Sequence, residues 1–553
     1  MSITCDRSRT RTSVLTVLGL CYFGIASQLV QAQVEIEGFF PPAVQRGSST
    51  TIKAEGKFAQ WPVKIECDLA ELTIACGEKN GEFVVTPAAT ATGMAWIRVH
   101  DSQSASLLVP VMIEPASVVL ETEPNDIRSK ASPVTYPATI VGKLEKNGDV
   151  DMWKVSLRSG EQLVTSIAAN TLFRSPMDCV LQLVDSRGLV VAQAEDSVGL
   201  DPQLQFASTK DADYYLRLFS FPETPTGTIG FAGGANFVYA LRITTGALVD
   251  HVLPLRAVPA EKLKPQAFGW NLPTDLLLEL KPATSIAPNT IFSTGAIGWQ
   301  WQPESPTDEW TFSTDEQGVA PESIRDLPLL YWGHILHEKE VDRVRVRAIG
   351  GVDYRADINS REFGFKLDSV LRVLKADTQA QIARNDDAER KNFDAGIQFK
   401  TETDEDLIIE VSDLANSGGL RHAYELQVAA VGPSASLSAA SDHFRIGIGK
   451  SLEIPISIQR DAGYAQRLEF SARTLPVGVT AEKIISEAKG DSSKAVKLKL
   501  NAAADAMAFQ GPIELIGTPV DEKQAPVAES LPVKFSLRPQ ISLRSVWLTT
   551  AAD

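Results

Sequence analysis

Oxygen-bearing side chains are concentrated in the stretch Glu121–Asp126, which reads Glu-Thr-Glu-Pro-Asn-Asp. Alternate side chains of an extended segment point to the same side, so Glu121, Glu123 and Asn125 would converge. Calcium takes about six to eight oxygen ligands from carboxylates, carboxamides, carbonyls and water. These residue types at this spacing therefore predict a candidate calcium site. The alternative is a solvated acidic linker whose Asn-Asp pair caps a turn.

Further ligands for such a site have to come from another element. The sequence Gly-Asp-Val-Asp at 148–151 is a turn that leads into a strand-like stretch. If the fold places this turn beside the acidic segment, Asp149 or Asp151 supplies one or two more carboxylates.

Two tryptophans suggest a different chemistry. In the stretch Gly-Trp-Gln-Trp-Gln-Pro, Trp299 and Trp301 would share one face of a strand. An exposed aromatic face stacks on the C–H side of a sugar ring, so the pair is a candidate carbohydrate site. The alternative, that one or both indoles fill a small β core, is favoured.

Three cysteines follow the first 32 residues. Cys67 and Cys76 flank an eight-residue segment, and in an oxidising compartment they are expected to form a disulfide that closes a hairpin. Cys179 alternates with Leu181 and Leu183, which predicts a buried thiol on one strand face.

Motifs typical of catalysis are missing from the sequence. Neither His-Glu-x-x-His nor Gly-x-Ser-x-Gly occurs, and the chain has only six histidines. His334 and His337 would point to opposite faces of a strand and could not share a metal. Gly447–Ser451 lacks the first glycine of a phosphate-binding loop and is expected to be a turn. The pair Asp386 and Asp387 is expected at a strand end, and the chain is not expected to be an enzyme.

The N-terminus and the net charge limit where the chain works. Residues 1–32 carry three arginines, a short apolar run and a final Ala32, a pattern typical of a secretory signal peptide. Without them, 68 acidic and 50 basic residues leave a net charge of 50 − 68 = −18. This charge argues against a nucleic-acid partner. No later apolar run is long enough to span a membrane, so a secreted, periplasmic or cell-surface protein is expected.

Short alternating apolar runs, separated by Gly, Pro, Asn or Asp, dominate the rest of the chain and predict an all-β fold. Part of this pattern occurs twice. The pairs Asp151 and Asp342, Asp178 and Asp368, and Asp196 and Asp386 are separated by 191, 190 and 190 residues. Each copy ends in a strand-like stretch that contains a tyrosine. The constant spacing indicates two copies of one domain.

The repeated order Gly-x-(Ile/Leu), Asp-Val-Asp or Val-Asp, Asp-x-Val-Leu, (Glu/Asn)-Asp and Tyr-x-Leu resembles the bacterial pre-peptidase C-terminal (PPC) domain. The resemblance implies a small jelly-roll-like β-sandwich appended to secreted enzymes and surface proteins. The flanking stretches resemble immunoglobulin-like and IPT/TIG-like modules of exported proteins of planctomycete type. In collagenase members of the family, a Glu-x-Glu-Pro-Asn segment and later acidic residues hold calcium. The resemblance therefore implies a site at Glu121, Glu123 and Asn125, and none before the second repeat.

The expected architecture is a tandem, elongated array of β-sandwiches: two jelly-roll-like PPC domains plus Ig-like sandwiches. Its parts are a signal peptide (1–32), an Ig-like domain (33–115), PPC-like sandwiches (116–247 and 314–430) with a TIG/Ig-like insert (248–313) between them, and a C-terminal Ig-like sandwich (431–553).

The function expected of this array is that of a non-catalytic exported scaffold for binding and adhesion. Its partner would be an extracellular protein or polysaccharide, and calcium its one possible cofactor. Two alternatives stay open: an accessory or targeting subunit of a secreted hydrolase, and an array of carbohydrate-binding modules.

Overall fold

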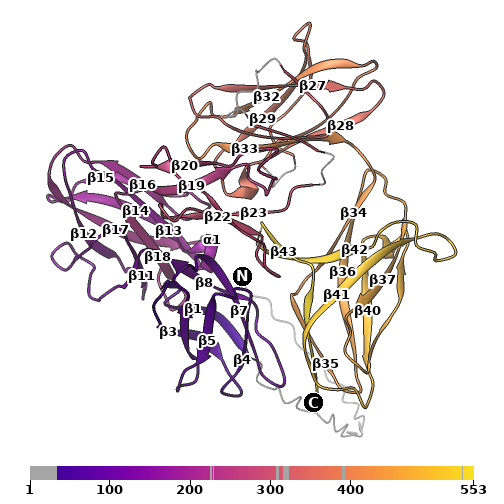
Figure 1. The fold of residues 1–553 in the computed structure, drawn as a ribbon, viewed down its shortest axis with the longest axis horizontal. Coiled ribbons are helices and arrows are strands. Elements are labelled where there is room, and N and C mark those ends of the chain that lie inside the picture. The colour runs from indigo at the N-terminus through magenta and orange to yellow at the C-terminus, as the bar shows by residue number, and fades with distance from the viewer. Residues whose placement is uncertain are drawn as a thin grey trace, which may run out of the picture. The chain divides into compact units, whose positions relative to one another are not determined.

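The computed structural model describes residues 34–224, 227, 230–306, 310–314, 323–388, 393–538 and 540–552 (Figure 1). The predicted signal peptide lies outside them. The described chain is built almost entirely from β-strands, with one helical turn, α1 (Asn170–Phe173), and two short 3-10 turns (Arg361–Phe363 and Asp491–Ser493). The predicted all-β fold of tandem sandwiches is therefore confirmed. No helix in these ranges is long and apolar enough to cross a membrane.

The N-terminal part consists of two four-stranded sheets around a common core. In order across the first sheet, the strands are β1 (Glu35–Phe40), β3 (Thr50–Lys57), β6 (Glu82–Pro87) and β5 (Leu72–Cys76). Across the second they are β2 (Ala43–Gln45), β8 (Val109–Glu114), β7 (Gly93–His100) and β4 (Lys64–Cys67).

The predicted disulfide between Cys67 and Cys76 is not formed, and both thiols are free. The cysteines end strands of different sheets, since β4 pairs with β7 and β5 pairs with β6. Each sulfur also has a local contact: the amide of Leu69 donates to Cys67, and the Cys76 thiol donates to the carbonyl of Val63. The segment between them is therefore not a hairpin that a disulfide could close.

We call residues 117–244 the first sandwich; it contains two five-stranded sheets. One sheet is β10 (Ser132–Pro133), β12 (Asp151–Leu157), β17 (Ala212–Pro222), β14 (Met177–Asp185) and β15 (Val190–Ala194). The other is β16 (Gln203–Ala207), β13 (Gln162–Ala168), β18 (Val238–Thr244), β11 (Ala138–Lys143) and β9 (Ser117–Leu120).

Residues 311–430, the second sandwich, repeat this topology. One sheet is β25 (Ile324–Arg325), β27 (Val341–Ala348), β32 (Glu405–Asp413), β29 (Ser369–Lys375) and β30 (Gln381–Asn385). The other is β31 (Gly396–Lys400), β28 (Asp353–Asn359), β33 (Ala423–Ala430), β26 (Leu329–His334) and β24 (Thr311–Thr314). Ten strands in the same order and the same pairing therefore occur twice.

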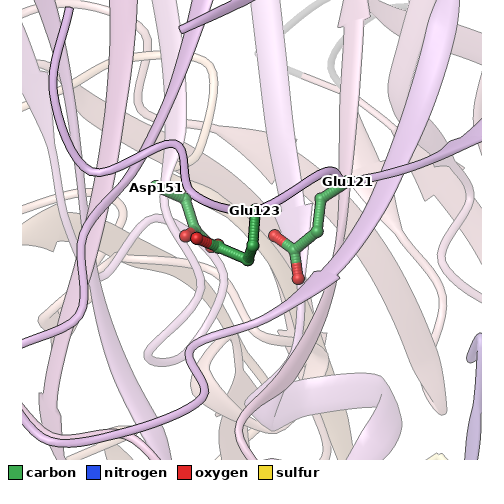
Figure 2. Close-up of side chains that lie close together, drawn as sticks. All are labelled: Glu121, Glu123 and Asp151. Carbon is green, nitrogen blue, oxygen red and sulfur yellow. The ribbon is translucent and has the colours of Figure 1, made fainter. Parts of the chain in front are cut away.

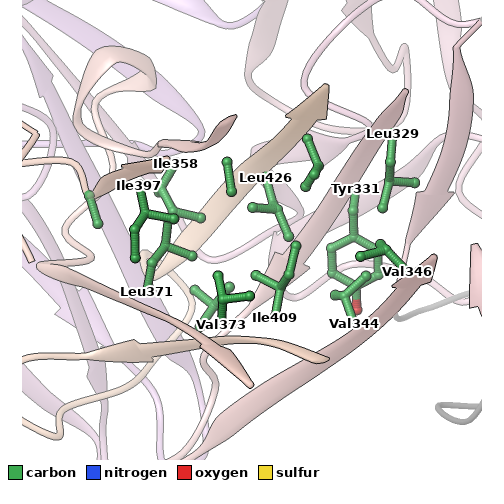
Figure 3. Close-up of a cluster of buried hydrophobic side chains, with 14 of the residues drawn as sticks. Leu329, Tyr331, Val344, Val346, Ile358, Leu371, Val373, Ile397, Ile409 and Leu426 are labelled. Atoms are coloured by element: carbon green, nitrogen blue, oxygen red, sulfur yellow. The ribbon is translucent and has the colours of Figure 1, made fainter. Parts of the chain in front are cut away.

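Strand alternation explains how each sandwich buries its core. In β27, Val344, Val346 and Ala348 are buried, and the arginines between them point outward. These side chains meet residues of the facing sheet such as Tyr331 and Leu426 (Figure 3). A two-residue period with one apolar face is what a half-buried antiparallel sheet requires.

The strands between the two sandwiches form two small sheets. β19 (Leu248–Leu253) pairs with β20 (Gln266–Trp270), and β21 (Glu279–Lys281), β22 (Asn289–Phe292) and β23 (Trp299–Gln302) form the other.

The C-terminal part is a branched sheet system of 11 strands. They are β34 (Ser434–Ala439), β35 (His443–Gly447), β36 (Ser451–Asp461), β37 (Arg467–Arg473), β38 (Val479–Glu482), β39 (Ile484–Ser486), β40 (Ala495–Ala502), β41 (Phe509–Val520), β42 (Leu531–Arg538), β43 (Ile541–Leu543) and β44 (Val546–Ala551). The predicted turn at Gly447–Ser451 is confirmed, because it links β35 to β36 through Gly449 at φ 74°.

Candidate cation site

The acidic segment Glu121–Asn125 enters the first sandwich beside β11. Strand β9 runs parallel to β11, and the amide of Glu121 continues this pairing by donating to the carbonyl of Val141 over 3.0 Å. The Glu121 carboxylate then accepts the backbone amide of Lys143. Two backbone-directed hydrogen bonds thus fix Glu121 at the end of the strand.

Three carboxylates converge at this point. One oxygen each from Glu121, Glu123 and Asp151 lies within 4.8 Å of the other two (Figure 2). Asp151 is the first residue of β12 and is fully buried, whereas Glu123 is exposed. The fold thus brings two of the predicted segment residues to one of the two predicted turn residues.

A tyrosine from the last strand of the sandwich completes the cluster. The Tyr239 hydroxyl lies 2.5 Å from an oxygen of Glu121 and 2.5 Å from an oxygen of Asp151. A hydroxyl has one proton to donate, so it can satisfy only one of the two carboxylates at a time. The second carboxylate requires a proton or a cation.

Asp151 and Asn125, whose backbone amide donates to the Glu123 carboxylate, both carry unsatisfied buried atoms. The Asn125 side chain is 1% exposed, and neither its oxygen nor its nitrogen has a hydrogen-bond partner. The Oδ1 atom of Asp151 is also without one. Each such buried atom costs about 1–3 kcal/mol. An unsatisfied oxygen on Asp151 and another on the segment residue Asn125 are what a hard, oxygen-seeking cation would satisfy, so the residues fit calcium.

Asp149 lies in the same turn but outside the three-carboxylate group. It is 2% exposed, and its Oδ2 accepts the amide of Glu145 over 2.5 Å. It therefore stabilises its own turn and is not part of the three-carboxylate group.

Electrostatics favour a neutralised cluster. Burial raises the pKa of Asp151, and repulsion from Glu121 raises it further. Burial also raises the pKa of Glu121, against the opposing effect of the Tyr239 hydroxyl. Glu121 and Asp151 can both be ionised only if a positive charge lies nearby, since like charges at short range disfavour joint ionisation.

Two glycines make room for the tyrosines of the two sandwiches. A Cβ atom at Gly142 would collide with the hydroxyl of Tyr239 and with Glu121, and one at Gly333 would lie 2.6 Å from the hydroxyl of Tyr424. Gly142 pairs with Tyr239 and Gly333 with Tyr424, each across adjacent strands.

The second sandwich keeps part of this arrangement. The Tyr424 hydroxyl donates to Asp342 over 2.6 Å, as Tyr239 does to Asp151. Residues 315–322, which follow β24, lie outside the described ranges. Within those ranges, the only group of at least three potential metal ligands is the one at Glu121, Glu123 and Asp151. The absence of a second calcium site stays a prediction.

The two tryptophans of the predicted sugar site lie in β23. Trp301 is 8% exposed and stacks on Trp96, with ring centroids 6.3 Å apart. Trp299 is half-buried, and its ring centroid is 5.1 Å from that of Trp301. A sugar ring could therefore reach only Trp299.

A buried histidine pair escaped sequence analysis. The Nε2 atoms of His251 and His334 are 2.6 Å apart, and Nδ1 of His251 is 2.7 Å from Asp250. Arg421 donates to the same aspartate. Burial lowers the pKa of both histidines.

Cys179 is fully buried, as its alternation with Leu181 and Leu183 predicted.

The sequence repeat contains a signal for Tyr239. The tyrosine-containing strands that end the two repeats occupy equivalent places, so aligning the copies pairs Tyr239 with Tyr424. A tyrosine found at the same place in both copies, across from a glycine and near an aspartate, points to a shared buried contact.

Comparison with known proteins gives limited matches. No family model matches the chain. A probable subtilase-type serine protease of Deinococcus radiodurans is 28% identical over 161 residues, or 27% of this chain. The chain spans about a fifth (21%) of that relative's length.

Solved structures similar to parts of the chain are β domains. The pre-peptidase C-terminal domain of a Bacillus anthracis collagenase is matched over 100% of its length and 22% of this chain, with 16% identity and a TM-score of 0.17. Fibronectin(III)-like modules of Clostridium thermocellum CbhA are matched over 87% of their length and 37% of this chain, with 12% identity and a TM-score of 0.12. Scores this low carry no argument about function.

Proposed function

We propose that the chain is an exported, non-catalytic binding scaffold in which two PPC-like sandwiches are flanked by Ig-like modules, and that calcium fastens the entry segment of the first sandwich. The all-β architecture and its repeated ten-strand topology support the scaffold. The catalytic motifs missing from the sequence support a binding role over a catalytic one.

The observation that carries the calcium proposal is the convergence of Glu121, Glu123 and Asp151 next to the unsatisfied side chain of Asn125. All of these groups offer oxygen, which suits calcium and disfavours metals that prefer nitrogen or sulfur. Extracellular calcium modules bind with dissociation constants of about 10⁻⁴–10⁻³ M. Such a site would be filled in a calcium-rich medium and would tie residues 121–125 to β12.

Thermal unfolding of the purified chain with and without calcium tests this proposal. At 10 mM calcium, a site of that affinity adds about 1.4–2.7 kcal/mol to the free energy of unfolding. The double variant Glu121→Gln, Glu123→Gln should lose this stabilisation.

The matched control, Glu338→Gln with Glu402→Gln, removes two charges from exposed positions of the second sandwich and should keep the calcium response. A calcium-dependent shift that survives in the Glu121, Glu123 variant would contradict the proposal.

A second candidate function is that of an accessory or targeting part of a secreted hydrolase. The matched segment of the probable serine protease favours it, because that segment is a small share of a longer chain. A hydrolytic screen separates the two functions. Turnover by the purified chain that persists after repurification would contradict the non-catalytic role, whereas retention of a co-expressed exported hydrolase would support the accessory role.

A further inference from the structure

A groove with a volume of 720 Å³ crosses the outer face of the first sandwich. Its floor comes from β12, β14 and β17, through Met152, Val184 and Phe219. Residues 126–129 form one wall, and the turn at Arg187 and Gly188 forms part of another. The groove thus starts directly after the candidate cation site.

Three guanidinium groups line this groove: those of Arg128, Arg187 and Arg217. Arg187 is paired with Asp185 over 2.8 Å. Among the described residues, Arg128 and Arg217 form no ion pair, and their recorded acceptors are the uncharged carbonyl of Ser186 and the side chain of Gln182. Asp126 is the one acidic residue in the lining. An arginine held by neutral acceptors keeps its charge available to an anion.

The arginines are held in place by their surroundings. Gln182 accepts from Nε of Arg217 over 2.8 Å, and the guanidinium lies 5.8 Å from the centre of the Phe219 ring. The guanidinium of Arg128 packs on the turn, 3.5 Å from where a Cβ of Gly188 would be. Side chains held in one geometry lose less conformational entropy when a ligand binds.

Aromatic rings form one end of the groove. Phe231 is 38% exposed and stacks on Phe219, with ring centroids 4.4 Å apart. Phe221 packs edge-on against both rings. The face of Phe231 that is turned away from Phe219 offers a flat apolar surface beside fixed positive charges.

The second sandwich does not repeat this surface. Position for position, Glu410 replaces Arg217, and Arg343 and Arg372 replace Met152 and Gln182, because each set pairs across the same three strands. Glu410 accepts from Arg343 over 2.9 Å and from Arg372 over 2.8 Å. Glu410 thus neutralises the charges of Arg343 and Arg372, and Ser412 stands where the first sandwich has Phe219.

We propose that the groove of the first sandwich binds an anionic polysaccharide, with carboxylate or sulfate groups on Arg128 and Arg217 and a sugar ring on Phe231. The backbone of β17 is already paired on both sides by β12 and β14, so a peptide cannot add there as a strand. A sugar polymer with negative charges and flat C–H faces could contact both the arginines and the Phe231 ring without pairing with the backbone. This inference rests on the proposed role of the chain as a binding scaffold.

Fluorescence anisotropy with the full chain tests the inference. The probes are a labelled hyaluronan hexasaccharide and a sulfated dextran fragment as anionic sugars, maltohexaose as a neutral sugar, and hexaglutamate as an anionic peptide. At least one anionic sugar should bind, more weakly at higher salt because exposed charges are screened. The double variant Arg128→Ala, Arg217→Ala should weaken it by about tenfold or more, equivalent to about 1.4 kcal/mol.

A matched control, Arg343→Ala with Arg347→Ala, removes two arginines from the same face of the second sandwich and should change binding less than about twofold. Phe231→Ala, at an exposed ring, should also weaken binding. The inference is overturned if no anionic sugar binds, if hexaglutamate binds as well as the sugars, or if both double variants lose binding equally.

Thermal unfolding with and without calcium distinguishes failure of the cation site from failure of the polysaccharide-binding groove. An unchanged calcium shift in the Arg128, Arg217 variant shows that the first sandwich is folded. If the Glu121, Glu123 variant keeps its calcium response while the arginine variant loses sugar binding, the cation site fails and the groove stands.

Discussion

The first and second sandwiches have one topology but differ at two surfaces. Both pack two five-stranded sheets in the same order, and both join a buried tyrosine to an aspartate. Among the described residues, only the first gathers three carboxylates at its entry segment, and only the first has an arginine, Arg217, at the outer-face position where the second has Glu410. What the sandwiches share accounts for folding, so function has to be sought where they differ.

Equivalent core positions should respond equally, and this gives the largest expected effect. Leu181 and Leu371 occupy the same place in β14 and β29, and both are fully buried. Replacing either by alanine should lower the free energy of unfolding of its own sandwich by about 2.7–5 kcal/mol, through lost burial and a cavity. Denaturant unfolding measures both losses. A large loss in one sandwich with none in the other would break the equivalence.

Acid should affect the two sandwiches differently, because His334 ends β26 where Lys143 ends β11. The folded pKa values of His251 and His334 lie below the ordinary value, so below about pH 6.5 the unfolded chain takes up protons that the folded chain does not. This stability is therefore present above pH 6.5 and is lost as the pH falls, at about 1.4 kcal/mol per pH unit for each histidine.

Denaturant unfolding between pH 7 and pH 4.5 measures this slope. His334→Gln should reduce it, and His337→Gln, at an exposed neighbour, is the matched control. Equal slopes in wild type and His334→Gln would rule out the buried pair as the cause.

The shared tyrosines give the smallest expected effect and the sharpest contrast. Tyr424→Phe removes the donor to the half-buried Asp342 and should cost about 1 kcal/mol, with or without calcium. Tyr239→Phe should cost up to about 3 kcal/mol without calcium, because Asp151 is fully buried, and less with calcium, which takes over the carboxylate charge. Thermal melts of both variants with and without the ion measure this. Calcium rescue of both variants, or of neither, would contradict a site confined to the first sandwich.

Local patterns predicted the fold well. Alternation over a few residues, as in β27, shows which side chains turn inward, and the near-constant aspartate spacing marks equivalent strands in the two sandwiches. Both signals lie within single strands, so they do not depend on knowing how the strands pair.

Features that depend on distant pairing could not be predicted in this way. The hairpin expected between Cys67 and Cys76 is absent because their strands belong to different sheets, which their spacing does not reveal. Tyr239 contacts Glu121 across 118 residues, and His251 meets His334 across 83. The acidic segment itself was visible because three of its oxygen-bearing groups lie within five consecutive residues.

The glycines opposite the tyrosines have a consequence for recognising relatives of this domain. A side chain at Gly142 or Gly333 would displace the ring of Tyr239 or Tyr424 from its buried position, whether or not an ion is bound nearby. A related domain can therefore lose the two glutamates of the entry segment and still keep the glycine, the tyrosine and the aspartate. A sequence profile weighted on those three positions would detect copies of the domain that bind a different ion or none. A profile weighted on the two glutamates would miss such copies.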